Sequence, residues 1–326
     1  MPELIGSVGW WTPPVGANVG YGYAAVEAIQ ALQRAGVGVW FKDTDAKSFI
    51  NFVQPDFYEG IYDQFRIGYT PWESSEIPKH WIPRMQEMDE IWTTSNYCKE
   101  IFEKYDVNDI IRVVPHGIDN DVWKVVNRYE PEDFYFLHVG GPTARKGAQR
   151  VVDAFLDLYE GNEHMFLVLK THDESEARAT YNGQFGNAGK HPQIIVINQD
   201  LDVYDLAALY ARCHCLVYPT NGEGFGLIPF QGIASGMPTI CTNATGCADF
   251  ASFSVPLDST PIEGIGIHLG MWVEPSPDHL REQMTYVVEN YDKVAERTVY
   301  SARILHNNST WDHVAQQIIG ILGEHL

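Results

Sequence analysis

The stretch that decides the fold is NGEGFGLIPFQGIASG, from Asn221 to Gly236, which follows the apolar run CLVYP at 215–219. A short apolar run, a glycine-rich turn and an apolar helical segment in this order predict a strand, a turn and a helix, the repeating unit of parallel α/β sheets. The turn carries one carboxylate, Glu223, and the predicted helix carries an amide, Gln231.

The chemistry of this turn favours an anionic ligand that also carries hydroxyl groups. Unpaired N–H groups at a helix N-terminus attract phosphate, whereas a carboxylate accepts hydrogen bonds from hydroxyls and an amide both donates and accepts them. These groups together suit a diphosphate that carries sugars. The alternative is that Glu223 only favours the helix start electrostatically and that Gln231 faces solvent.

A second turn of this kind lies in FLHVGGPTARKG, from Phe136 to Gly147. An apolar strand pattern ends in two glycines, and Arg145 and Lys146 precede the next helical segment. Glycines allow the backbone to approach a ligand, and cations near a helix N-terminus suit an anion. An ordinary turn with solvated basic residues is the alternative. The GxxxxGK[ST] spacing of a Walker A loop is absent.

Apolar runs alternate with helical patterns along the whole chain, which predicts an α/β protein with two doubly wound parallel sheets. Ligands of such folds bind at the C-terminal ends of the strands, here in a cleft between two domains. The polar segment 120–133 shows no strand pattern and places the domain boundary near Glu130. We expect domains at 1–130 and 131–305, followed by an amphipathic C-terminal helix within 306–326. A further helix is expected over 22–36, closed by Gly36. The predicted strands are 4–9, 37–41, 64–70, 89–94, 110–115, 134–140, 165–170, 193–198, 213–219 and 238–241.

Composition narrows the classes of partner. The 326 residues carry a formal net charge of −21, which disfavours nucleic acid, because its binders neutralise phosphates with a basic surface. Five cysteines without paired CxxC motifs indicate reduced thiols, and Cys213 and Cys215 fit a buried strand better than a zinc site. No signal peptide and no 18-residue apolar run is found, so we expect a cytoplasmic protein without a transmembrane segment.

The segment LYARCHCLVYPTNGEGFGLIPFQGIASGMPTICTNATGCADF, at 209–250, resembles the donor-binding signature of family-4-type glycosyltransferases. FLHVGGPTARKG is similar to the diphosphate loop of that family, and VVPHGIDNDVW (113–123) to its interdomain segment. EIWTTSNYCKEIF (90–102) resembles one of its strand–helix units, and TWDHVAQQI (310–318) the helix that crosses back to the first domain. The resemblance covers roughly two-thirds of the chain. It implies the GT-B fold, in which two Rossmann-like domains flank an interdomain cleft.

Carried over to this chain, the resemblance assigns the nucleotide-sugar donor site to the second half. Glu223 would contact the transferred sugar, and Gln231 would replace the glutamate that holds the nucleotide ribose. Arg145 and Lys146 would hold the diphosphate and stabilise the charge of the leaving group. The other implied donor contacts are Gly141 in the basic turn and Gly224, Phe225, Gly226 and Leu227, which follow the carboxylate.

The chain departs from the family pattern at three positions. Gln231 stands where the second glutamate is usual, so it would bind a ribose without charge assistance. Gly141 stands where an arginine is common, and Arg145 would take over that role. Asp249 replaces the glutamate of the GxxE motif.

The loop TPPVGANVGYGY, at 12–23, is similar to the glycine loop that lies near the donor phosphates and the acceptor in the family. The resemblance implies substrate contacts from Gly16, Asn18 and Gly20. The loop lacks the GxGxxG fingerprint of dinucleotide-binding proteins. A plain turn is the alternative reading of any one of these glycines.

Two more candidates lie in the first half. Glu73, in YTPWESSEIP at 69–78, stands in a loop where many relatives carry a histidine. It would orient a hydroxyl or accept the acceptor proton; the alternatives are that it caps the next helix or pairs with a basic neighbour. His116 lies in the interdomain segment and would face the cleft, although a lone histidine is more often structural.

We therefore expect a retaining glycosyltransferase that moves a sugar from a nucleoside-diphosphate sugar to a hydroxyl acceptor, with no metal or other cofactor. The triplet DTD at 43–45 lies outside the predicted donor half. The helix over 22–36 has Arg34 as its only cation, so we expect a glycan, small-molecule or macromolecular acceptor rather than a lipid. The alternative is a non-catalytic nucleotide- or sugar-binding protein on the same scaffold. A nicotinamide-dependent oxidoreductase is disfavoured because the dinucleotide fingerprint is missing.

Overall fold

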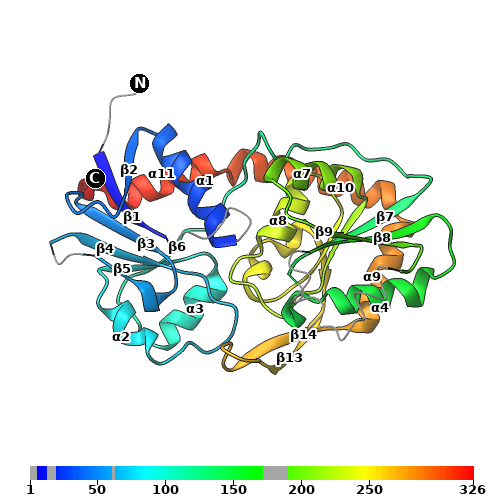
Figure 1. Cartoon of the computed structure of the whole chain (residues 1–326), viewed down its shortest axis with the longest axis horizontal. Coiled ribbons are helices and arrows are strands. Elements are labelled where there is room, and N and C mark those ends of the chain that lie inside the picture. Colours follow the sequence, from blue (N-terminus) through cyan, green and yellow to red (C-terminus); the bar gives the residue numbers. More distant parts are fainter. Residues whose placement is uncertain (1–5, 13–19, 61–62, 142, 172–189) are drawn as a thin grey trace. The chain divides into compact units, whose positions relative to one another are not determined.

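The computed structural model describes residues 6–12, 20–60, 63–141, 143–171 and 190–326 (Figure 1). The chain forms two compact units. The first contains the residues up to Asp119 together with Gly264–Met271 and Asn307–Leu326, and the second contains Asn120–Glu263 and Trp272–His306. The chain therefore first passes from one unit to the other after Asp119, whereas the predicted boundary was near Glu130. In addition, the short segment Gly264–Met271 of the second half belongs to the first unit.

A six-stranded parallel sheet in the order β2-β1-β3-β4-β5-β6 forms the centre of the first unit. Five of these strands match the sequence predictions, whereas β3 was not predicted, because the polar residues Ser48 and Asn51 interrupt its short apolar run. The strands are β1 (Gly6–Trp11), β2 (Val37–Phe41), β3 (Ser48–Phe52), β4 (Phe65–Tyr69), β5 (Glu90–Thr93) and β6 (Ile111–Val113); the helices are α1 (Gly20–Arg34), η1 (Pro55–Phe57), α2 (Trp81–Gln86), α3 (Asn96–Lys104), α11 (Trp311–Leu322) and η4 (Gly323–His325).

The second unit has its own six-stranded parallel sheet, in the order β12-β11-β10-β7-β8-β9. The five predicted strands are confirmed, and β12 and the two-stranded sheet β13-β14 are additional. The strands are β7 (Phe134–Val139), β8 (Met165–Thr171), β9 (Ile194–Asn198), β10 (Cys215–Tyr218), β11 (Thr239–Thr242), β12 (Val255–Leu257), β13 (Ser259–Glu263) and β14 (Met271–Pro275); the helices are η2 (Ala144–Lys146), α4 (Ala148–Tyr159), α7 (Val203–Arg212), α8 (Leu227–Ala234), η3 (Thr245–Phe253), α9 (Pro277–Glu289) and α10 (Tyr291–Asn308).

The C-terminal helix α11 returns to the first unit, as the resemblance implied (Figure 1). Thr310 is its N-cap, and the Thr310 hydroxyl accepts a hydrogen bond from the backbone N–H of His313 at 3.3 Å. Arg34 of α1 forms an ion pair of 2.7 Å with Asp312 of α11. Of the helices that the structure describes, none is both long enough and apolar enough to cross a membrane.

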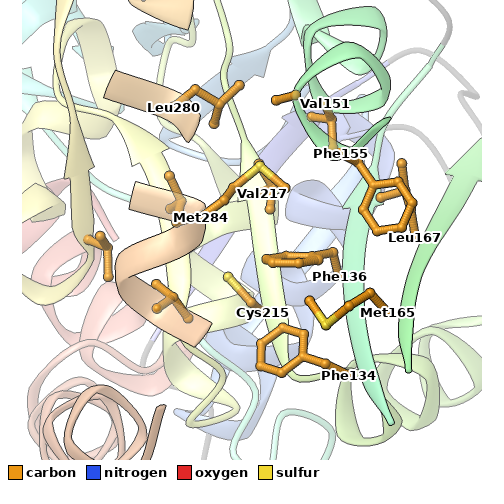
Figure 2. Packing of buried hydrophobic residues seen from close by; sticks show 14 of the residues in the cluster. Phe134, Phe136, Val151, Phe155, Met165, Leu167, Cys215, Val217, Leu280 and Met284 are labelled. Carbon is orange, nitrogen blue, oxygen red and sulfur yellow. The ribbon is translucent and has the colours of Figure 1, made fainter. Parts of the chain in front are cut away.

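The core of the second unit holds the strands that lead into the two predicted turns (Figure 2). Phe136 of β7 and Val217 of β10 pack with Phe155 of α4 and Met284 of α9, and all four side chains are almost completely buried. Full burial of a large apolar side chain contributes about 1.5–3 kcal/mol. This packing fixes β7 and β10 side by side, so that both turns begin at the same edge of the sheet.

Candidate functional site

The predicted glycine-rich turn connects β10 to α8. Gly226 is the N-cap of α8 and has a φ of 102°. A Cβ atom at Gly226 would lie 2.6 Å from the Cys247 sulfur, so both the backbone conformation and the surrounding space require glycine. The turn therefore holds its shape because of a tight fit against η3.

The basic turn at the end of β7 is bonded directly to the glycine-rich turn. The backbone N–H of Asn221 donates to the Arg145 carbonyl at 2.8 Å, and Thr220 Oγ1 lies 3.1 Å from the same oxygen. Gly147, with a φ of 78°, lies against the Pro219 carbonyl, where a side chain would clash. These contacts bring together two segments that are more than 70 residues apart in the sequence.

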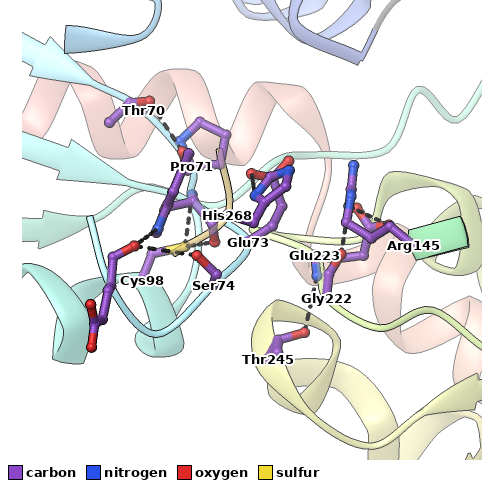
Figure 3. Close-up of polar contacts among 12 residues, drawn as sticks. Thr70, Pro71, Glu73, Ser74, Cys98, Arg145, Gly222, Glu223, Thr245 and His268 are labelled. Carbon is purple, nitrogen blue, oxygen red and sulfur yellow. Dashed lines mark hydrogen bonds and ion pairs between the residues drawn. The ribbon is translucent and has the colours of Figure 1, made fainter. Parts of the chain in front are cut away.

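Glu223 is the centre of a buried polar cluster, and Figure 3 shows it next to Arg145. Its Oε1 lies 2.6 Å from Lys146 Nζ and 3.2 Å from Arg145 Nη1. The hydroxyls of Tyr218 and Thr220 donate to the same oxygen at 2.8 and 3.2 Å. No residue that the structure describes bonds to Oε2, which leaves that oxygen able to accept hydrogen bonds from a ligand.

The cluster keeps the Glu223 carboxyl ionised. Burial alone would raise its pKa, but the charges of Lys146 and Arg145, helped by the Tyr218 hydrogen bond, outweigh burial and lower the pKa to about 2. Burial and the neighbouring carboxylate raise the pKa of Tyr218, so its hydroxyl stays protonated and donates. The two cations and one carboxylate sum to a net charge of +1, which suits an anionic ligand.

Tyr218 and Thr220 were not recognised as site residues from the sequence. Tyr218 belongs to the apolar run CLVYP, which predicts only a buried strand. His138 of β7 supports it: the two rings stack at 5.9 Å, and His138 Nδ1 lies 2.9 Å from the Val217 carbonyl. The position of a hydroxyl at the carboxyl end of a strand is the signal that could have identified Tyr218.

The remaining predicted donor residues lie in the same turn, on α8 and just after β7. Gln231 is 5% exposed, and its side chain forms no hydrogen bond with any described residue, so the reading in which it faces solvent is wrong. Phe225 points into an aromatic group with Phe230 and Phe250, at ring distances of 5.0 and 5.6 Å. Its side chain is therefore part of the core, and only its backbone can approach a ligand. Leu227 begins α8, Gly224 directly follows Glu223, and Gly141 follows β7 by two residues.

Glu73 lies in the first unit, in the loop after β4. Its Oε2 lies 3.9 Å from Nδ1 of His268, which comes from the segment Gly264–Met271 that joins this unit. His268 also packs on the Trp72 ring, with the ring centroids 5.2 Å apart. Of the two alternatives to a catalytic role, pairing with a basic neighbour matches this geometry, whereas the N-cap position of α2 is occupied by His80.

His116 is 6% exposed and lies among aromatic rings of the first unit. It contacts Phe52 at 6.1 Å and Trp311 at 5.7 Å between ring centroids, and burial lowers its pKa to about 3. This environment favours a structural role, and a substrate contact stays a prediction. Gly20 begins α1, while Gly16 and Asn18 lie outside the described residues.

All five cysteines are buried and free. His214, between Cys213 and Cys215, accepts a hydrogen bond from the Tyr135 backbone N–H at 3.0 Å, as expected for residues that pack beside a strand. Within the described part of the chain, no group of three or more His, Cys, Asp or Glu side chains is arranged to hold a metal ion.

Two parallel α/β units, with a polar site where strands of the second sheet end, define the class of protein as GT-B. Sucrose-phosphate synthase from Thermosynechococcus elongatus has the same fold, with a TM-score of 0.71 and 14% identity over 98% of each chain. Anabaena HepE in complex with UDP and glucose gives a TM-score of 0.72 at 12% identity over 97% of this chain and 98% of that chain. The predicted fold class is confirmed.

The family follows from the sequence comparison. The family model described as "Glycosyl transferases group 1" matches residues 119–304, more than half of the chain, so the chain belongs to the group 1 glycosyl transferases. A protein named as a glycosyltransferase in Sulfolobus islandicus filamentous virus is 26% identical over 49% of this chain and 42% of its own length. An uncharacterized glycosyltransferase of Methanocaldococcus jannaschii is 24% identical over 62% of this chain and 50% of its own length. The matched stretches are thus half or less of these relatives.

Proposed function

We propose that the protein transfers a sugar from a nucleoside-diphosphate sugar to a hydroxyl acceptor. The observation that carries this proposal is the buried, ionised Glu223, which two cations hold at Oε1 while no described residue bonds to Oε2. Membership of the group 1 glycosyl transferases supports the same reaction class.

Different residues of the site bind different parts of the donor. Oε2 of Glu223 accepts hydrogen bonds from the hydroxyls of the transferred sugar, and the net positive charge next to it attracts the diphosphate. Arg145 and Lys146 stabilise the negative charge that develops on the leaving diphosphate. The amide of Gln231, buried and without a hydrogen bond to any described residue, binds the ribose hydroxyls.

We also propose that the transfer retains the anomeric configuration and uses no metal ion. The bond from the anomeric carbon to the diphosphate oxygen breaks, and the acceptor oxygen forms its bond from the same face. The acceptor proton passes to an oxygen of the leaving diphosphate. The protein contributes orientation and positive charge, with Arg145 and Lys146 supplying the charge that a metal ion supplies elsewhere.

Turnover by Glu223→Gln tests the proposal. UDP-glucose is the first donor to use, because HepE has been crystallised with it, followed by ADP-glucose and GDP-mannose, each with a mixture of sugar and glycan acceptors. We expect release of nucleoside diphosphate by the wild type and a loss of about 100-fold or more in the variant. Equal rates for the two proteins would show that Glu223 has no part in transfer. Proton NMR of the product reports the configuration of the new bond.

The second candidate function is a nucleotide- or sugar-binding protein that lacks turnover. Gln231 favours it, because an amide binds a ribose without the charge assistance of the usual glutamate. Tight donor binding without product over the whole panel of donors and acceptors would support this candidate over the enzyme. Gln231→Glu would then be expected to strengthen nucleotide affinity.

A further inference from the structure

The guanidinium of Arg150 connects three segments of the second unit. Arg150 lies in α4, four residues after the basic turn. Its Nε and Nη2 donate to Oε1 and Oε2 of Glu274 in β14 at 2.9 and 2.8 Å, which is a bidentate pair. Its Nη1 donates to Oδ1 of Asn221 at 3.1 Å and to the Ala144 carbonyl at 3.4 Å. One side chain thus bonds β14, the glycine-rich turn and η2.

Asn221 forms several hydrogen bonds in this network. It is 1% exposed and precedes Glu223 by two residues. Its side-chain Nδ2 donates to the Val273 carbonyl at 2.5 Å, and its own carbonyl accepts from the Val273 N–H at 3.0 Å. Its backbone N–H donates to the Arg145 carbonyl. Asn221 therefore bonds the turn that carries Glu223 both to β14 and to the basic turn.

We propose that Arg150 is a positioning residue of the donor site, and that with Glu274 it fixes Asn221 and thereby the spacing between Glu223 and the Arg145–Lys146 turn. This inference rests on the proposed function. Neither Arg150 nor Glu274 touches the donor in it.

Only an arginine can make these contacts. A guanidinium presents five N–H donors in a rigid fork, whereas an ammonium is a single point charge that cannot hold a carboxylate bidentately and reach an amide as well. The Arg150 side chain is 22% exposed and that of Glu274 36% exposed, so the pair is better shielded than a fully solvated surface ion pair. Replacing Arg150 with lysine keeps the charge and removes the geometry.

The control is a second bidentate pair. Arg112 donates from Nε and Nη2 to Glu90 at 2.8 and 2.7 Å, and both residues belong to the first unit, which does not contain the donor cluster. Arg112→Lys and Arg150→Lys remove the same kind of interaction. If an ion pair only stabilises the fold, removing it lowers the unfolding temperature and leaves the ligand affinity of the folded protein unchanged.

Calorimetric titration with UDP and with UMP shows whether Arg150 positions the donor site or only stabilises the fold. Where the wild type prefers another base, the diphosphate and monophosphate of that base are used. We expect Arg150→Lys to weaken UDP binding by about 10-fold or more, because losing one charge-assisted hydrogen bond to the diphosphate has an effect of about this size. We expect a smaller effect on UMP, since the misplaced cations serve the diphosphate. Arg112→Lys should leave both affinities within about 2-fold of the wild type.

The outcomes distinguish this inference from the function on which it rests. If no nucleoside diphosphate binds the wild type, the proposed function and this inference both fail. If the wild type binds UDP and Arg150→Lys binds it equally well, or loses UDP and UMP affinity in the same proportion, this inference alone is overturned. Should Arg150→Lys not fold, Glu274→Gln, which also breaks the bidentate pair, is expected to show the same selective loss of diphosphate affinity.

Discussion

Glu223 is expected to stabilise the second unit through its charge, and Glu223→Gln measures this contribution. Burial alone would raise the pKa of the carboxyl, yet Lys146 and Arg145 bring it from 4.5 down to about 2. One pKa unit corresponds to about 1.4 kcal/mol, so the folded protein favours the carboxylate over the neutral acid by about 3 kcal/mol. The glutamine is neutral and close in shape, and it leaves two largely buried cations without their counter-charge.

The sign of the pH dependence follows from the direction of this shift. Because the folded pKa lies below the unfolded one, the stabilisation is complete above pH 4.5 and is lost as the pH falls toward 2. We expect Glu223→Gln to lower the free energy of unfolding of the second unit by about 3 kcal/mol at pH 7. The difference from the wild type should shrink below pH 4.5.

Urea unfolding at pH 7 and at pH 3.5 is the assay, with hydrogen exchange and mass spectrometry used to follow peptides of the second unit separately. Glu296→Gln, on the exposed face of α10, is the matched control for loss of one carboxylate. If Glu223→Gln falls within about 0.5 kcal/mol of this control at pH 7, the carboxylate is not held by its two cations as described.

Three further substitutions test contacts that stabilise the two units, the first two in the unit that carries the site. Gly226→Ala combines a φ of 102° with a clash against a neighbouring thiol, so its melting temperature should fall well below that of Gly161→Ala, which has a φ of 82° and open space; equal values would exclude the clash. Arg128→Lys should cost about 2 kcal/mol in urea unfolding, because Arg128 donates to backbone carbonyls at the end of α7 and the end of α8; an unchanged midpoint would contradict this role. Arg34→Ala removes an exposed ion pair and should change the unfolding free energy by less than about 1 kcal/mol, so a larger loss would show that α11 depends on that pair.

The regular parts of the fold follow closely from the sequence. Helix α1 ends just before Gly36, which has a φ of 87°. Of the fourteen strands in the described part of the chain, ten were predicted by apolar runs between turn residues. The short strand SFINF at 48–52 was missed because Ser48 and Asn51 interrupt its apolar run; both are fully buried, and their side chains are hydrogen-bonded to backbone carbonyls. The sheet β13-β14 was missed because its strands are partly exposed and its connection belongs to the first unit.

The sequence predicted most residues of the candidate site, but not the contacts between them. The glycine-rich turn identifies Glu223, and the basic turn identifies Arg145 and Lys146, because each lies where a strand pattern ends. That these cations pair with Glu223 is a contact across 77 residues, and it depends on β7 and β10 being neighbours in the sheet. Local patterns do not determine strand order, so the ion pairs of Glu223 with Lys146 and Arg145 were not foreseen. Tyr218 is only five residues from Glu223, but it lies in an apolar run that predicts no more than a buried strand.

Calorimetric titration of a nucleoside-diphosphate sugar and of the corresponding nucleoside diphosphate is the most direct test of the claim that the Glu223 cluster binds the donor. We compare the wild type, Glu223→Gln and Lys146→Met. Glu223 serves the sugar and Lys146 the diphosphate, so Glu223→Gln should lose affinity mainly for the nucleotide sugar, while Lys146→Met should lose affinity for both ligands. The claim is contradicted if both variants bind both ligands as tightly as the wild type, or if the wild type binds neither.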